Sequence, residues 1–236
     1  AVYRKEEAGM FNAASFEMIP WILGSCGSVE EAAELLENTC VTDAAFSAGL
    51  PPAPLHWMLA DCRKCLVLEP VRTGLNILDN PIGVLTNNPP FEYHRWNLNQ
   101  YLNLQAAPAV NRFAAGLELK PCSQGVGAAG LPGDASSVSR FIRAAFLKWN
   151  SVSGSTEEEN VSQFFHILDG VSMVRGSVVT PRGTWDITTY SCCVNAMRGI
   201  YYYKTYEDSR IRRIDMREND LSGDSLITEI DRKVSF

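Results

Sequence analysis

The chain has 236 residues, of which 46% are hydrophobic, and its formal net charge is −6 at pH 7. This is enough apolar material for the core of one globular domain, while the acidic balance argues against nucleic acid as a partner. No apolar run approaches the roughly 20 residues that a helix needs to cross a bilayer, and the first residues lack the layout of a signal peptide. We therefore expect a single domain over residues 1–236 that does not act at a membrane.

Seven cysteines are spread along the chain. An odd number in a chain of this length is not a disulfide framework, so we expect free thiols in a reducing compartment, the cytoplasm. Cys62 and Cys65 have the spacing of a zinc or redox pair, but no second pair or histidine stands at a suitable distance. We predict a hairpin turn at this pair, and no metal or other cofactor.

The first residues predict two helices. Residues 12–26 look helical, and Pro20 is expected to bend this helix in its middle. Ser28 and Glu31 have the spacing of a capping box, which predicts a second helix over residues 28–39.

The segment 41–54 is rich in alanine, glycine and proline and has no periodicity. Its large apolar residues are Phe46 and Leu50. They either pack beneath the loop or line an apolar ligand pocket, as large apolar residues of loops do around small molecules.

Strands follow. Residues 56–60 and 65–68 flank a short polar turn and predict a hairpin, with a third strand at 76–78. The run Val84-Leu-Thr-Asn-Asn-Pro-Pro-Phe91 predicts a strand end that runs into a proline stop. In such a place Asn87 usually caps local backbone.

A helix is expected over residues 92–104, and its His94 is expected at the surface or in packing, because no metal ligand stands at a suitable spacing. Residues 105–130 are too long and irregular for an economical connection, which indicates either a functional segment or a surface excursion without a partner.

The stretch Gly130–Trp149 predicts a turn followed by a helix that Ser136 or Ser137 caps. Arg140 and Arg143 lie in its first turns among apolar residues. An arginine that enters a core needs anionic or hydrogen-bonding partners; the alternative is that both arginines are solvated.

The remainder of the chain predicts one helix and then strands. Thr156 and Glu159 form a capping box at the start of a helix over residues 155–170. Three strand-like runs then follow, at residues 184–194, 199–206 and 210–216.

Two of these stretches resemble signatures of a known family. The run Pro132-Gly-Asp-Ala-Ser-Ser-Val-Ser-Arg-Phe-Ile-Arg-Ala144 resembles a signature of the choloylglycine hydrolase family, which contains bile salt hydrolases and penicillin V acylases. The VLTNxPxF run that contains Asn87 resembles a second one, and the agreement is collinear over nearly the whole chain. The resemblance implies an α+β fold, the four-layer αββα sandwich of the N-terminal-nucleophile hydrolases.

In that family the nucleophile is an N-terminal cysteine whose α-amine serves as the base, and it attacks a non-peptide amide. Residue 1 here is alanine, so the resemblance implies the C-terminal portion of such an enzyme, with the front strands and the nucleophile missing and the chain inactive by itself. The resemblance carries two catalytic residues over to this sequence. Asn87 donates hydrogen bonds at the scissile carbonyl, and Arg140, which directly follows Ser139 in the signature, lowers the pKa of the thiol.

The overall pattern is more similar to bile salt hydrolases, so the implied reaction is the deconjugation of glycine- or taurine-conjugated bile salts. Phe46 and Leu50 are then expected to bind the substrate, and segment 105–130 is expected to help assemble a homotetramer. The alternatives are a penicillin V acylase, a non-catalytic ligand-binding or assembly remnant of the fold, and an α+β domain of unknown function.

Overall fold

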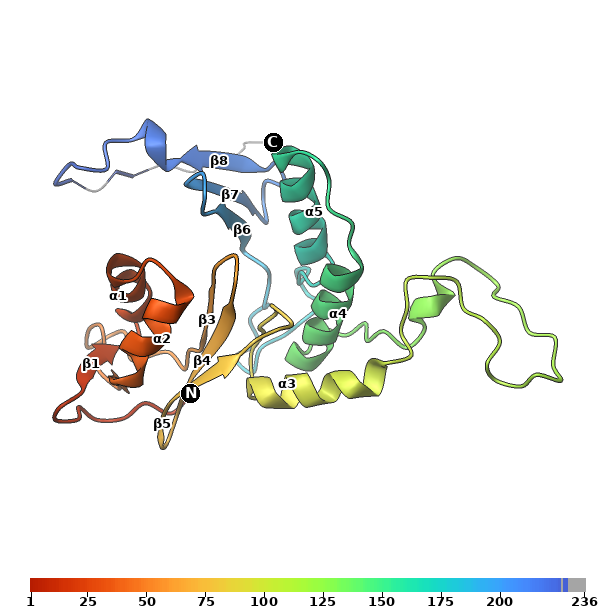
Figure 1. Ribbon diagram of the computed structural model, residues 1–236, viewed down its shortest axis with the longest axis horizontal. Helices are drawn as coiled ribbons and strands as arrows, with labels where there is room; N and C mark the ends of the chain where they lie inside the picture. Colours follow the sequence, from red (N-terminus) through yellow and green to blue (C-terminus); the bar gives the residue numbers. More distant parts are fainter. Residues whose placement is uncertain (226, 229–236) are drawn as a thin grey trace. The chain divides into compact units, whose positions relative to one another are not determined.

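The computed structural model describes residues 1–225, 227 and 228. These residues form helices and both parallel and antiparallel strands (Figure 1), in agreement with the expected α+β class. They divide into two compact units, Ala1–Asn97 and a second unit that begins at Leu98. The four-layer stacking, the missing front strands and the single-domain organisation stay predictions.

A three-stranded antiparallel sheet, in the order β3-β4-β5, forms the centre of the first unit. Its strands are β3 (Trp57–Ala60), β4 (Cys65–Val71) and β5 (Gly74–Asp79). The predicted hairpin is confirmed, since Trp57 pairs with Leu68 and Ala60 with Cys65. Five consecutive residues of β4 are buried, so this central strand is covered on both faces.

Residues 12–26 are not one helix. Strand β1 (Phe11–Ala14) pairs in parallel with β2 (Thr39–Thr42), and α1 (Met18–Ser25) starts only after it. Pro20 therefore lies in the first turn of α1, where its missing N–H would have no helical partner, and the expected bend in mid-helix is wrong.

The second predicted helix is α2 (Val29–Glu37), and its expected capping box is only half formed. The Ser28 hydroxyl accepts the Glu31 N–H at 3.2 Å, but the Glu31 carboxylate accepts the N–H of Gly27 and not that of Ser28. Both helices pack on β4 in one apolar cluster, which consists of Ala13, Met18, Ile22, Ala32, Leu36, Val41 and Leu68.

Two other boundaries differ from the predictions. Residues 84–86 are not a strand, because the side chain of Asn80 bonds the backbone of Gly83 and Val84 in place of a neighbouring strand. The helix expected over 92–104 is shorter: α3 (Phe91–Asn97) is followed by the 3₁₀-helix η1 (Leu98–Tyr101).

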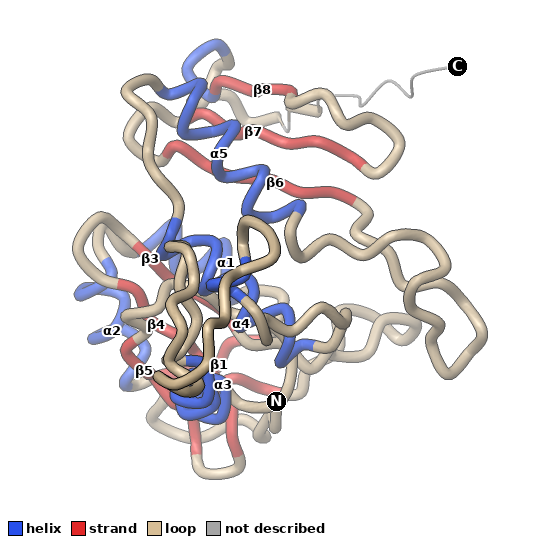
Figure 2. Tube along the Cα trace, turned by 90° about the vertical axis from the view of Figure 1, so that its right-hand side faces the viewer, coloured by secondary structure: helices blue, strands red, loops and turns tan. Residues whose placement is uncertain are grey.

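The second unit contains α4 (Ser137–Asn150), α5 (Glu157–Asp169) and an antiparallel sheet. The sheet has the order β6 (Tyr190–Asn195), β7 (Ile200–Thr205) and β8 (Arg212–Asp215), and α5 lies along it (Figure 2). Two further 3₁₀-helices are η2 (Val126–Ala128) and η3 (Met216–Glu218). Phe141 of α4, Phe165 of α5 and Ile200 of β7 are buried.

Both ends of α5 are bonded to the sheet. At its start the Glu157 carboxylate accepts the Asn195 amide at 2.6 Å and the Tyr202 hydroxyl at 3.0 Å. At its end Asp169 forms an ion pair with Lys204, with both carboxylate oxygens 2.7 Å from Nζ. The Thr156–Glu159 capping box is confirmed.

The strand expected from residue 184 starts only at Tyr190. Residues 180–184 instead close a local turn, in which the Thr180 N–H donates to the Thr184 carbonyl at 2.8 Å. Segment 105–130 is irregular apart from η2, as expected, and forms a long excursion in the chain (Figure 1). In the part of the chain that the structure describes, no helix combines the length and the apolar character needed to cross a membrane.

Candidate active site

The start of α4 is organised by Asp134 and Ser136. The Ser136 hydroxyl caps the helix by accepting the Ser139 N–H at 3.3 Å. The Asp134 carboxylate accepts the Ser139 hydroxyl at 2.5 Å and the Ser136 N–H at 2.9 Å. These bonds from Ser136 and Ser139 hold the pKa of Asp134 well below its usual value. The turn before the helix therefore has one defined conformation.

Arg143 is bonded to backbone carbonyls around this turn. Its Nη1 donates to the Pro132 carbonyl at 2.9 Å and to the Asp134 carbonyl at 3.0 Å, and its Nε donates to the Gly170 carbonyl at 2.6 Å. Arg143 thus joins the turn before α4 to the end of α5. This is a structural role, and the expectation that both arginines are solvated is wrong for this residue.

Arg140 occupies the neighbouring turn of α4 and is half-buried, with its Nε donating to the Ala135 carbonyl at 3.0 Å. Burial lowers the pKa of Arg140, the negative charge of Asp186 opposes this, and the positive charge of Arg143 adds to it. An arginine stays protonated under such shifts. Arg140 therefore places a permanent positive charge next to the turn that Asp134 and Arg143 hold.

The depressed pKa of Asp134 makes a prediction for stability. Its folded pKa lies below the unfolded value near 4, so its contribution is complete above about pH 4 and is lost as the pH falls through the folded pKa. We expect Asp134→Asn to lower the urea midpoint of unfolding at neutral pH. The difference in urea midpoint between this variant and the wild type should become smaller toward about pH 3. Glu158→Gln, an exposed change on α5, is the control and should show no such narrowing. A gap that is independent of pH would contradict this role of the carboxylate.

Asn87 lies in the irregular segment between β5 and α3 and is exposed. Its backbone carbonyl accepts a bond from Nε2 of His94, a fully buried residue of α3, at 3.0 Å. The Asn88–Pro89 peptide bond that follows is cis. Of the two expectations for His94, packing in the interior is confirmed. Its bond to Asn87 was not predicted, because it depends on how α3 folds back on the segment.

Phe46 and Leu50 are 67% and 58% exposed, so they do not pack beneath the loop. A backbone bridge between Ser47 and Leu50 closes a tight turn, and the ring of Phe46 stands edge-on to Phe16 with 5.1 Å between centroids. Ile19 and Leu23 of α1 in the same unit are exposed as well. Asn87, Phe46 and Leu50 belong to the first unit, and Arg140 belongs to the second.

The seven cysteines all lie in the described part of the chain, and none of them forms a disulfide bond. Cys62 and Cys65 flank the β3–β4 turn, where the predicted hairpin is confirmed. Among the described residues, no three histidine, cysteine, aspartate or glutamate side chains gather in a way that could hold a metal ion. Burial raises the pKa of the Cys26, Cys40 and Cys193 thiols, which disfavours the reactive thiolate form.

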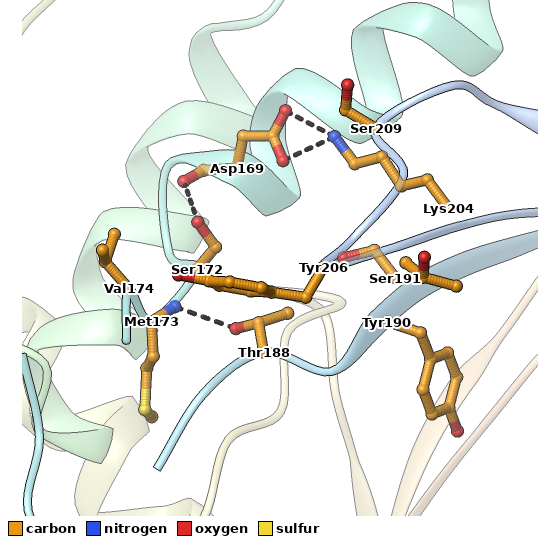
Figure 3. Close-up of a pocket in the computed structure, with 11 residues that line it drawn as sticks. Asp169, Ser172, Met173, Val174, Thr188, Tyr190, Ser191, Lys204, Tyr206 and Ser209 are labelled. Atoms are coloured by element: carbon orange, nitrogen blue, oxygen red, sulfur yellow. Dashed lines mark hydrogen bonds and ion pairs between the residues drawn. The ribbon is translucent and has the colours of Figure 1, made fainter. Parts of the chain in front are cut away.

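A cavity of about 160 Å³ in the second unit contains none of the predicted site residues (Figure 3). The Asp169–Lys204 pair lies on one side of it. On another side the Thr188 hydroxyl accepts the Met173 N–H at 2.8 Å. The Asp169–Lys204 pair beside the cavity joins α5 to β7, which is a structural role.

Comparison with known proteins decides the family. A model of the linear amide C–N hydrolases of the choloylglycine hydrolase family matches residues 1–229. The chain belongs to the choloylglycine hydrolase family. This family member is 44% identical to the bile salt hydrolase/transferase of Lactiplantibacillus plantarum, over 97% of this chain and 70% of that protein. It is 40% identical to the bile salt hydrolase/transferase of Clostridium perfringens, over 96% of this chain and 69% of that protein.

Two solved structures have a similar fold. A cysteine-to-alanine mutant of the conjugated bile acid hydrolase from Clostridium perfringens matches with a TM-score of 0.90 at 40% identity, over 98% of this chain and 71% of that one. Penicillin V acylase from Agrobacterium tumefaciens matches with a TM-score of 0.69 at 20% identity, over 95% of this chain and 63% of that one. The second likeness concerns the fold alone.

Proposed function

We propose that this chain is the C-terminal portion of a cysteine amidase that deconjugates glycine- or taurine-conjugated bile salts. The observation that carries the proposal is the identity of 44% and 40% to two bile salt hydrolases, each over at least 96% of this chain. The two signatures that contain Asn87 and Arg140 add to it.

In the proposed reaction a cysteine thiolate attacks the amide carbonyl carbon, and an α-amine accepts the thiol proton. An α-amine has an ordinary pKa near 8 and can accept a proton at neutral pH. Asn87 donates to the oxygen that becomes negative. The carbon–nitrogen bond then breaks, the proton passes to the leaving glycine or taurine nitrogen, and water hydrolyses the thioester to release the bile acid.

The nucleophile of this mechanism lies outside residues 1–236. Each of the seven cysteines here is joined by a peptide bond on its amino side, so none carries the α-amine that serves as base. The chain spans about 70% of the length of the bile salt hydrolases it matches, which leaves room for such a segment. The proposed role of Arg140 is to stabilise the thiolate of that cysteine by its positive charge, and we expect residues 1–236 alone to be inactive.

Phe46 and Leu50 are proposed to contact the steroid part of the substrate. Their exposure on a turn held by the Ser47–Leu50 bridge supports this, because an apolar ligand needs apolar side chains that are accessible to it. Seven cysteines without a disulfide bond support the proposed cytoplasmic location.

The deciding experiment combines intact mass and N-terminal sequencing of the natural polypeptide with assays on glycocholate, taurocholate and penicillin V. We expect to find a polypeptide or a companion chain that begins with cysteine. We expect this protein to hydrolyse the two bile salts faster than penicillin V. A large preference for penicillin V would make penicillin V, and not a bile salt, the substrate. Hydrolysis by a polypeptide that begins at Ala1 would overturn the mechanism. If a polypeptide that begins with cysteine hydrolysed none of the three substrates, a binding or assembly role would be favoured.

We also propose that segment 105–130 mediates assembly into a homotetramer. It exposes large apolar side chains, among them Phe113 at 85% and Leu119 at 49%, around a hollow of about 700 Å³. Asn111 orders the turn, because its side chain donates to the carbonyls of Ala114 and Leu117 and accepts the Phe113 N–H. A large, pre-ordered apolar surface is typical of an interface.

The assembly proposal predicts that Phe113→Asp combined with Leu119→Asp shifts the protein to smaller species in sedimentation velocity, because charge is depleted from interface cores. Val152→Asp, an equally exposed apolar residue between α4 and α5, is the matched control and should leave the size unchanged. Equal size of wild type and the double variant would exclude this segment as the interface.

A further inference from the structure

We propose that three buried polar side chains, Glu69, Asn80 and His94, hold segment 83–90 in one conformation and thereby act as positioning residues for Asn87. The consequence for catalysis rests on the proposed function, in which Asn87 donates to the substrate carbonyl. That these side chains fix the segment rests only on their own hydrogen bonds to the backbone.

His94 contacts the segment at Asn87 itself. A carbonyl oxygen can only accept, so Nε2 of His94 carries the proton that bonds the Asn87 carbonyl at 3.0 Å. Burial lowers the pKa of His94, against the opposing effect of the carbonyls of Asn87 and Pro89, so the ring is neutral at physiological pH with its proton on this nitrogen. A fully buried ring thus holds the backbone of an exposed residue from the inside.

Asn80 holds the start of the segment. It is 2% exposed, its Oδ1 accepts the Gly83 N–H at 2.9 Å, and its Nδ2 donates to the Val84 carbonyl at 3.1 Å. Its own N–H donates to the Cys65 carbonyl at 2.9 Å. The segment therefore leaves the sheet at a defined angle, tied to the first residue of β4.

Glu69 holds the helix that carries His94. Its carboxylate, buried in the middle of β4, accepts the Phe91 N–H at 2.9 Å and lies 3.4 Å from Nδ1 of His56. Burial acts to raise the pKa of Glu69, but the bonds from His56 and Phe91 outweigh it and leave the pKa below its usual value. A charged carboxylate at the first N–H groups of a helix is favourable, and it sets where α3 begins relative to the sheet.

These contacts come from β4, from the residue directly after β5 and from α3, and they converge on a segment without secondary structure of its own. A hydrogen-bond donor displaced by about 1 Å can cost a reaction about 10²-fold. Buried polar side chains that bond the backbone of a segment favour one of its conformations over the others. Asn87 would gain its geometry from this network.

The test uses two His94 variants in the protein that carries the nucleophile. His94→Leu removes the donor and keeps a side chain of similar size, while His94→Gln retains an N–H that can reach the Asn87 carbonyl. We expect His94→Leu to lower kcat about 10²-fold with KM within about threefold, and His94→Gln to stay within about threefold of wild type. Leu36→Ala, in the apolar cluster on β4 and 1% exposed, is the control that lowers stability and keeps kcat.

Amide hydrogen exchange of residues 84–88 gives a second readout that does not depend on activity. We expect about tenfold faster exchange in His94→Leu, and wild-type exchange in His94→Gln. If the wild-type enzyme hydrolysed neither bile salts nor penicillin V, the proposed function would be wrong. The hydrogen-exchange rates would then still test whether His94 fixes the segment. Equal kcat in the two variants, or unchanged exchange in His94→Leu, would overturn the positioning role.

Discussion

Asn87→Ala is expected to lower kcat for a conjugated bile salt about 10²- to 10³-fold, because Asn87 is the proposed donor to the oxyanion and the loss of one such donor costs this much in acyl transfer. The bond from His94 is made to the backbone oxygen of Asn87, which alanine retains. Since the residue is also exposed, the free energy of unfolding should change by less than about 0.5 kcal/mol. Activity and stability should therefore separate at this position.

Steady-state kinetics on glycocholate and urea unfolding of the same preparations measure the two effects. Asn88→Ala is the matched control, since it removes the same amide from a neighbour that is exposed as well. If both alanine variants retained kcat, the polarisation of the carbonyl would have to come from elsewhere.

The two arginines of α4 are expected to fail in different ways. In Arg140→Met the positive charge that we propose to stabilise the thiolate is lost, so the pKa of the thiol should rise by about one to two units and kcat/KM at neutral pH should fall about 10- to 10²-fold. The acid limb of the pH profile of kcat/KM should move to higher pH by the same amount, about one to two pH units. In Arg143→Met three carbonyls lose a charged donor, so the free energy of unfolding should fall by about 2 kcal/mol or more.

Each methionine variant serves as the control of the other, because the same change is made one helical turn apart. The pH dependence of kcat/KM and the urea midpoint are measured for both. An unshifted acid limb in Arg140→Met would remove the proposed effect on the thiol, and an unchanged midpoint in Arg143→Met would contradict the structural role.

Local signals in the sequence predicted local structure well. The Thr156–Glu159 capping box and the serine cap of α4 depend on side chains within three residues of each other, and both are present. The hairpin of β3 and β4 likewise needs only a short turn. Strand β1 was missed because its partner, β2, lies more than 20 residues away, and its residues also fit a helical pattern.

The candidate site divides in the same way. The family signatures point to Asn87 and Arg140. The spacing of the residues alone does not distinguish the role of Arg140 from that of Arg143, since both lie on one helix. The separation comes from Gly170 and Pro132, whose carbonyls Arg143 reaches only in the folded chain. The roles of Glu69 and His94 were missed for the same reason: the Phe91 N–H and the Asn87 carbonyl that they bond are backbone atoms, which leave no mark in the sequence.

The attachment of α5 to the sheet at both ends has a consequence for how the second unit opens. Glu157 bonds Asn195 and Tyr202 at one end, and Asp169 bonds Lys204 at the other, so neither end can fray without breaking contacts to β6 or β7. Helix ends normally have the lowest local opening free energy in a domain. Here the helix and the β6–β7 hairpin should open together, as one cooperative unit.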